Sequence, residues 1–113
     1  MHELSIVLSI LDIVEEKVRE HQACAVESIE LEIGQLAGIE WEAMDFAWDA
    51  AVRGTVLENS SREIRKVEGR ARCQECGEVF PCPVLFNPCP TCGSVFSDLL
   101  QGKELRIKSI VLT

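Results

Sequence analysis

The sequence has few aromatic residues and no tyrosine. Aromatics make up 5% of its 113 residues, whereas hydrophobic residues make up 47%, so any core must be built mainly from aliphatic side chains. We find no apolar run long enough to cross a bilayer and no positively charged leader, and therefore expect neither a membrane span nor a signal peptide. This length allows one modest core and a small appendage, not two ordinary domains.

Basic residues are also scarce. The formal net charge is −8, and the excess of acids is concentrated in residues 1–69, which hold fifteen acidic and six basic residues. Residues 102–113 hold one acid and three bases. Because binding to nucleic acid requires a basic face opposite the phosphates, this distribution argues against a nucleic-acid partner.

Catalytic signatures are absent. The chain has two histidines, no serine–histidine–carboxylate pattern and no phosphate-binding glycine loop. We therefore expect a protein that is not an enzyme.

The most specific motif is a pair of Cys-x-x-Cys turns. Each turn lets two thiolates reach one ion from the same side, and two turns together complete a tetrahedron. Four thiolates without an open position predict a structural Zn²⁺ site, with iron in a rubredoxin-like site as the minor alternative. The ligands are Cys73, Cys76, Cys89 and Cys92.

Two further cysteines lie outside this motif. Cys82 lies between the two pairs and is the alternative thiolate if the metal site rearranges, whereas Cys24 is expected to be a small hydrophobic filler. Because metal binding explains the cysteines better than disulfides do, a reducing cytoplasm is the expected compartment.

Hydrophobic periodicity predicts an α+β fold. We expect a small three-stranded antiparallel or mixed sheet that carries two helices, plus a zinc ribbon inserted on a two-stranded stem. One strand loses its alternation between Ile64 and Val67, where we expect a bulge or kink. The predicted helices are 4–21 and 40–52, and the predicted strands are 28–33, 62–73 and 104–112.

The domain organisation follows from these elements. Residues 1–69 and 102–113 are predicted to form one α/β domain, and residues 70–101 the zinc-ribbon domain. Cross-strand pairs should help to fix the order of the strands. They would join the acids Glu30 and Glu32 to Arg106, Lys108 or Arg65.

The N-terminus is a second candidate metal site. The backbone nitrogen of His2 and its imidazole Nδ1 can close a six-membered chelate ring, and either the Met1 amine or the Glu3 amide can close a five-membered ring with the same nitrogen. The position opposite that nitrogen is then left for an outside oxygen. Planar coordination by ionised amides suits Ni²⁺ or Cu²⁺ and not Zn²⁺.

Several motifs together resemble the HypA/HybF family over essentially the whole chain. They are Met1-His2-Glu3-Leu4-Ser5, Glu32-Ile33-Gly34, Glu40, Arg53-Gly54-Thr55 and the four ribbon cysteines. The resemblance implies a nickel metallochaperone of nickel–iron hydrogenase maturation, with some members serving urease. It further implies nickel held by His2 and neighbouring backbone nitrogens, an assisting carboxylate at Glu40, and a structural zinc. The implied partners are a HypB-type GTPase and the hydrogenase large subunit.

We therefore expect a cytoplasmic nickel-delivery protein whose acidic surface favours the capture of cations. The alternative is an interaction adaptor whose zinc ribbon presents a protein-binding surface, without any nickel function and with His2 idle.

Overall fold

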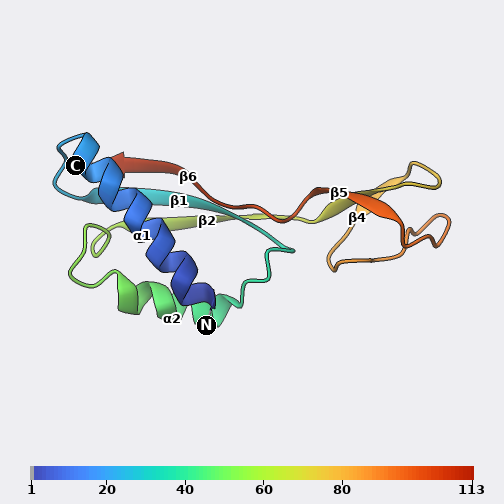
Figure 1. Ribbon diagram of the computed structural model, residues 1–113, viewed down its shortest axis with the longest axis horizontal. Coiled ribbons are helices and arrows are strands. Elements are labelled where there is room, and N and C mark those ends of the chain that lie inside the picture. The colour runs from blue at the N-terminus through green and yellow to red at the C-terminus, as the bar shows by residue number, and fades with distance from the viewer. Residues whose placement is uncertain (1) are drawn as a thin grey trace. The chain divides into compact units, whose positions relative to one another are not determined.

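The computed structural model describes residues 2–113 and folds into two helices and two three-stranded sheets over that range. The strand orders are β2-β1-β6, which Figure 1 shows, and β4-β3-β5. The predicted α+β class, with two helices on a three-stranded sheet, is confirmed. The elements are α1 (His2–Glu20), β1 (Val26–Gly34), α2 (Trp41–Ala51), β2 (Ser61–Val67), β3 (Arg70–Cys73), β4 (Val79–Pro81), β5 (Ser97–Gln101) and β6 (Leu105–Leu112).

The chain divides into two compact units. One comprises the residues up to Leu31, Ile39–Ile64 and Ile107–Thr113, and the other comprises Glu32–Gly38 and Arg65–Arg106. The division between residues 1–69 with 102–113 and residues 70–101 stays a prediction. Neither helix of the described chain has the length and apolar character needed to cross a membrane.

The core of the first unit is largely aliphatic, and much of it comes from the buried side of α1. The buried side of α1 follows helical spacing through Val7, Ile10, Leu11, Val14 and Val18. The start of α1 lies beside the start of α2 in Figure 1. The fully buried side chains of this unit include Val7, Val14, Ile29, Leu31, Met44 and Leu57.

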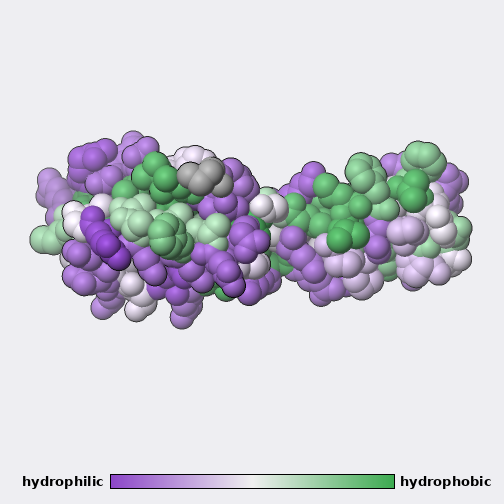
Figure 2. All heavy atoms as spheres, turned by 90° about the horizontal axis from the view of Figure 1, so that it is seen from below, coloured by the Kyte–Doolittle hydropathy of each residue, from purple (hydrophilic) through white to green (hydrophobic). Residues whose placement is uncertain are grey.

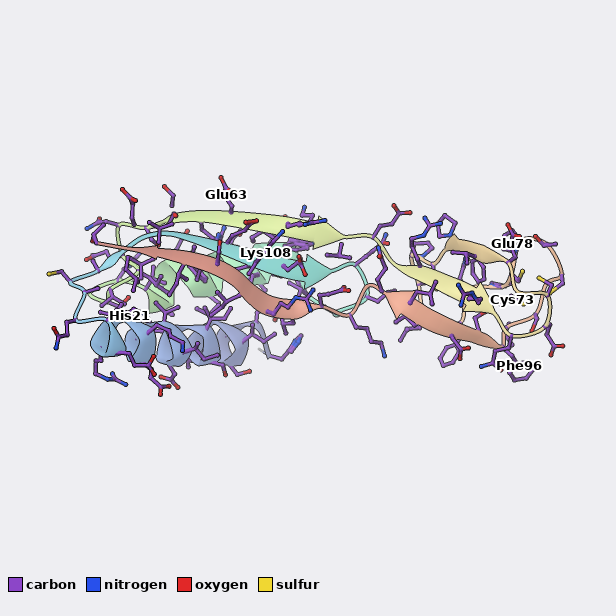
Figure 3. All side chains as sticks on the ribbon, turned by 90° about the horizontal axis from the view of Figure 1, so that it is seen from above. His21, Glu63, Cys73, Glu78, Phe96 and Lys108 are labelled. Carbon is purple, nitrogen blue, oxygen red and sulfur yellow. The ribbon has the colours of Figure 1, made fainter. Side chains whose placement is uncertain are left out.

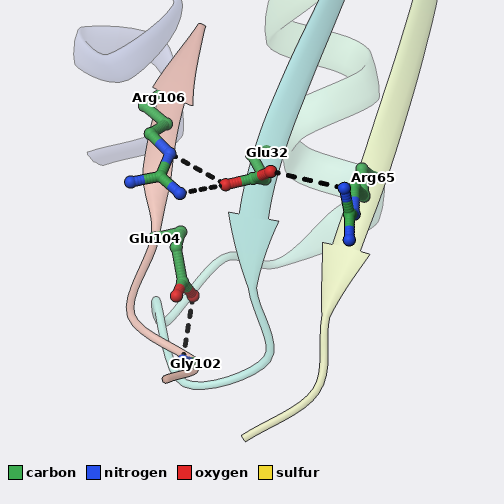
Figure 4. A network of polar contacts seen from close by, with 5 residues as sticks. All are labelled: Glu32, Arg65, Gly102, Glu104 and Arg106. Carbon is green, nitrogen blue, oxygen red and sulfur yellow. Dashed lines mark hydrogen bonds and ion pairs between the residues drawn. The ribbon is translucent and has the colours of Figure 1, made fainter. Parts of the chain in front are cut away.

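Charged residues bridge neighbouring strands in the way the sequence predicts. The buried carboxylate of Glu32 on β1 accepts a hydrogen bond from Arg106 Nε on β6 at 2.8 Å and is also bonded by Arg106 Nη2. Arg65 Nη1 on β2 lies 3.9 Å from the other oxygen of Glu32. One carboxylate therefore contacts both outer strands of the β2-β1-β6 sheet, as Figure 4 shows.

The predicted strand 62–73 is not continuous. It is two strands, β2 and β3, separated at Glu68 and Gly69. Within β2 the alternation of exposure is broken where Arg65 and Lys66 are both exposed, at the place where the sequence predicts a bulge or kink. Gly69 N–H donates to the side-chain oxygen of Gln35 at 2.9 Å, and Gly69 C=O accepts from Cys82 N–H at 2.8 Å. The strand therefore ends at Val67 and resumes at Arg70, because the backbone of Gly69 bonds Gln35 and Cys82.

Three glycines allow the backbone to pass through a narrow junction inside the second unit. A Cβ on Gly34 would lie 2.0 Å from Gly102 O, and a Cβ on Gly69 would lie 2.1 Å from Cys82 O. Both distances are far below van der Waals contact, so only glycine fits at these positions. Gly102 has a φ of 124°, which also favours glycine.

We expect Gly69→Ala to lower the free energy of unfolding by about 1–3 kcal/mol, because the added methyl group clashes with backbone. Gly69 is not among the glycines with positive φ. Without the clash, the same change would stabilise the protein by about 0.4–1 kcal/mol, because alanine lowers the conformational entropy of the unfolded chain. Urea denaturation of the zinc-loaded protein measures the sign, and a stabilised Gly69→Ala variant would show that the junction is open.

Candidate metal sites

The ribbon presents its four cysteines from two matching turns. Gly77 N–H donates to Cys73 C=O at 3.0 Å, and Gly93 N–H donates to Cys89 C=O at 2.8 Å. Both glycines have positive φ, 79° and 76°, as expected for the residue after a Cys-x-x-Cys turn. Cys73 ends β3, where Figure 3 labels it.

The four sulfur atoms all lie within 4.8 Å of one another. Cys73 Sγ is 3.5 Å from Cys92 Sγ, and Cys76 Sγ is 3.6 Å from Cys89 Sγ. A tetrahedral zinc with Zn–S bonds of about 2.3 Å needs sulfurs roughly 3.8 Å apart. The arrangement therefore fits a closed Zn²⁺ site made of thiolates alone.

Crowding pushes the thiol pKa values in opposite directions. The Cys76 N–H and the neighbouring Cys92 thiol lower the pKa of Cys73 to about 7. The Glu78 N–H lowers the pKa of Cys76, but desolvation and the adjacent thiols of Cys89 and Cys73 outweigh it and raise that pKa to about 12. Four thiolates this close repel one another, so the full ligand set needs the charge of a cation.

The remaining cysteines stand apart from this cluster. Cys82 is buried with Ala71 and Phe80, and its thiol donates to Val84 C=O at 3.1 Å. It therefore contributes to packing inside the ribbon. The interpretation of Cys24 as a buried filler is wrong, because its side chain is exposed.

A second group of donors lies at the start of α1. His2 and Glu3 occupy the first turn, where backbone N–H groups have no acceptor within the helix. Ser5 Oγ donates to His2 C=O at 2.8 Å and holds that turn. The His2 side chain is 56% exposed.

The side chain of Glu3 connects this turn to α2. It is 6% exposed, and its Oε2 accepts a hydrogen bond from Glu40 N–H at 3.1 Å. The same oxygen lies 3.3 Å from His2 Nδ1. Hydrogen bonds from the N–H groups of Glu40 and of Glu3 itself lower the pKa of this carboxyl to about 2, so Glu3 is a fixed negative charge beside the imidazole.

Glu40 stands at the N-cap position of α2 with extended backbone, φ −86° and ψ 111°. Its side chain makes no capping hydrogen bond and is exposed. Many N-cap side chains bond the first N–H groups of their own helix. The Glu40 carboxylate does not bond the N–H groups of α2 in this way.

The structure thus brings His2, Glu3 and the backbone of Glu40 together, and gathers the four ribbon cysteines separately. Met1 lies outside the described residues. The sequence analysis considered only the amide of Glu3 and missed its carboxylate. Glu3 precedes buried Val7, Ile10 and Val14 at helical spacing, and that spacing could have shown that its side chain points inward.

A four-thiol ribbon, carried by an α+β chain with two helices, defines a small metal-binding protein. The family model described as "Hydrogenase/urease nickel incorporation, metallochaperone, hypA" matches residues 1–112. The chain belongs to this HypA family.

Curated relatives agree with this assignment. A hydrogenase maturation factor HypA from Parabacteroides distasonis is 47% identical over 112 residues, which are 99% of this chain and 97% of that relative. A hydrogenase maturation factor HypA from Geotalea daltonii is 42% identical and covers 99% of both chains.

Solved structures share the fold. The solution structure of a HypA protein has a TM-score of 0.69 at 26% identity and covers 100% of this chain and 97% of that one. The solution structure of the Ni metallochaperone HypA from Helicobacter pylori has a TM-score of 0.66 at 24% identity, covering 97% of this chain and 96% of that one.

We expect Cys73→Ser or Cys89→Ser to lose bound zinc and the ordered ribbon, because the binding free energy of a structural zinc is largely folding free energy. Cys82→Ala should keep the zinc, since this thiol donates to Val84 C=O outside the cluster. Zinc content per chain and amide NMR dispersion of the ribbon measure both effects. Full zinc occupancy in Cys73→Ser would remove that residue from the ligand set.

Proposed function

We propose that this chain is a nickel metallochaperone that delivers Ni²⁺ during the maturation of nickel–iron hydrogenase, and that it performs no catalysis of its own. Its membership of the HypA family supports the proposal. The observation that carries it is the buried Glu3 carboxylate, which joins the His2 turn to the start of α2.

The cargo site is built from nitrogen donors. We assign His2 Nδ1 and the His2 amide to nickel, with the Glu3 amide or the Met1 amine as the adjacent nitrogen. Deprotonated amides and imidazole in a plane are a ligand set that Ni²⁺ accepts and Zn²⁺ does not favour. The carboxylate of Glu40 is the assisting oxygen in this proposal, because it is exposed and does not cap its own helix.

The electrostatics of the helix start need compensation. The N-terminal end of a helix carries a partial positive charge that repels a cation. The ionised Glu3, 3.3 Å from His2 Nδ1, offsets this charge and attracts the metal to the imidazole. Exposure of His2 leaves the cargo accessible for transfer to another protein, as delivery requires.

The other assignments follow from the same proposal. The four ribbon cysteines hold a structural zinc that stabilises the ribbon. The partners are a HypB-type GTPase and the hydrogenase large subunit, with urease as a further recipient system, and the compartment is the cytoplasm. The family match gives no support to the alternative of an adaptor without a nickel function.

His2→Ala should abolish specific nickel binding while leaving zinc content and thermal stability nearly unchanged, because His2 is exposed and starts its helix. His21→Ala is the matched control, since the other histidine of the chain is exposed at the opposite end of α1. Calorimetric nickel titration of both variants measures the difference. Wild-type nickel affinity in His2→Ala would refute the site.

Nickel affinity should fall as the pH is lowered from 7 to 5, by at least about tenfold per unit, because each proton displaced by the metal contributes a factor of ten. The Glu3 pKa is lowered to about 2. Its ionised contact is therefore present above its ordinary pKa and is lost only as the pH falls toward 2. Between pH 7 and 5 the loss must come from the nitrogen ligands.

Nickel titrations at pH 7, 6 and 5, each in two buffers of different ionisation enthalpy, count the protons released per nickel. Far-UV circular dichroism should stay constant over the same range. A nickel affinity that does not change with pH would exclude ligands that must first lose protons.

A further inference from the structure

An apolar groove of about 250 Å³ lies between α1 and α2. It is lined by Glu3 and Leu4 of α1 and by Ala43, Phe46, Ala47 and Ala50 of α2. Phe46 is 78% exposed, and Leu8, one turn beyond Leu4, is 46% exposed. Apolar side chains scattered singly over a surface are ordinary, but a grouped patch beside a groove marks a contact site.

The rim of this groove is acidic. Glu42 and Asp49 lie one helical turn before and after Phe46, and Asp12 lies one turn beyond Leu8. None of these three acids has an ion-pair partner among residues 2–113. Asp45 differs, because its carboxylate accepts a hydrogen bond from Arg62 at 2.7 Å. Figure 2 shows this face, with green apolar residues grouped beside purple hydrophilic ones.

We propose that this groove is a docking site for an amphipathic helix of a partner protein, with leucine-like anchors on one side and lysine or arginine on the other. The volume suits anchors of this kind, since an enclosed cavity of about 150 Å³ accepts a benzene-sized group. The basic residues of the occupant would face Glu42 and Asp49.

The backbone of the two helices that line the groove favours a helical partner over an extended one. Both walls are helices, whose N–H and C=O groups are bonded internally. An extended peptide would therefore gain no main-chain hydrogen bonds here, as it would at the edge of a sheet. A helix satisfies its own backbone and needs only an apolar groove.

Charge excludes the other occupants. A second copy that used the same face would bring Glu42 and Asp49 against their own counterparts. Anionic lipid and nucleic acid would meet the same repulsion. A basic helix is the occupant whose charge complements the rim.

The groove lies next to the proposed nickel site. Glu3 lines the groove, and the same carboxylate contacts His2 and Glu40. A docked helix would therefore cover one side of the nickel site. This consequence rests on the proposed function, whereas the docking does not.

The test uses the full zinc-loaded chain and a fluorescent synthetic peptide that is helical, with leucine on one face and lysine on the other. A peptide with the same residues in shuffled order controls for charge alone. Anisotropy titration should show that the amphipathic peptide binds at least about tenfold more tightly than the shuffled one, because only it presents grouped anchors.

Three variants locate the binding. Phe46→Ser should weaken the amphipathic peptide about tenfold, and Glu42→Gln with Asp49→Asn should weaken it about three- to tenfold, less so at high salt. Glu27→Gln with Glu63→Gln removes the same charge elsewhere and should change the affinity less than about twofold. Glu63 lies on β2, at the side of the sheet opposite α1 in the view of Figure 3.

Equal losses in the two charge variants, or an unchanged affinity in Phe46→Ser, would overturn the proposal. It would also be overturned if sedimentation showed that the chain is a dimer and Phe46→Ser a monomer, because a second copy would then cover this face. Nickel titration of Phe46→Ser separates the proposed docking groove from the proposed nickel function. Unchanged nickel affinity with lost peptide binding supports the groove, and lost nickel affinity with intact peptide binding overturns it.

Discussion

A single hydrogen bond, from Glu40 N–H to the carboxylate of Glu3, holds the proposed nickel site together. The two residues are 37 positions apart in the chain, and each begins a helix. The bond fixes the first turn of α1 against the start of α2 and keeps a negative charge beside His2 Nδ1. Without it, only packing between α1 and α2 would hold the His2 turn near the start of α2.

The cysteine site and the proposed nickel site have opposite physical requirements. The ribbon offers four close sulfurs from two rigid turns, and their mutual repulsion is relieved only by a cation, which suits permanent binding. The N-terminal turn offers exposed nitrogens that must lose protons before they bind. Such a site depends on pH and is open to competing ligands, which suits a cargo. The chemistry of the donors thus separates a resident zinc from a transported nickel.

The parts of the fold that follow from local pattern could be predicted from the sequence. The helix predicted at 40–52 is found at Trp41–Ala51, because spacing of apolar residues and flanking glycines are local signals. The strand predicted at 62–73 is interrupted at Gly69, because a hydrogen bond to the distant Gln35 replaces continuity there. A partner 34 positions away leaves no local signal.

The candidate sites could likewise be predicted only where their residues lie close together in the sequence. The cysteine spacing predicts the cluster because both halves of the ligand set are short motifs. The helix predicted at 4–21 includes Leu4 and Leu8, but its periodicity could not show that both side chains would stay exposed. The helix predicted at 4–21 left out Glu3, although helical spacing puts Glu3 in line with the buried Val7. Its partner Glu40 is brought close only by the packing of the two helices.

The most direct test of this account is calorimetric nickel titration of Glu3→Gln beside the unaltered chain at pH 7, with Glu20→Gln at the other end of α1 as the control. Glutamine keeps the size of the side chain and an oxygen that can accept from Glu40 N–H, but it removes a charge close to His2. We predict unchanged zinc content and a nickel Kd raised about tenfold in Glu3→Gln, as expected for losing a unit charge within about 4 Å, with no change in Glu20→Gln. An unaltered nickel Kd in Glu3→Gln would contradict the account.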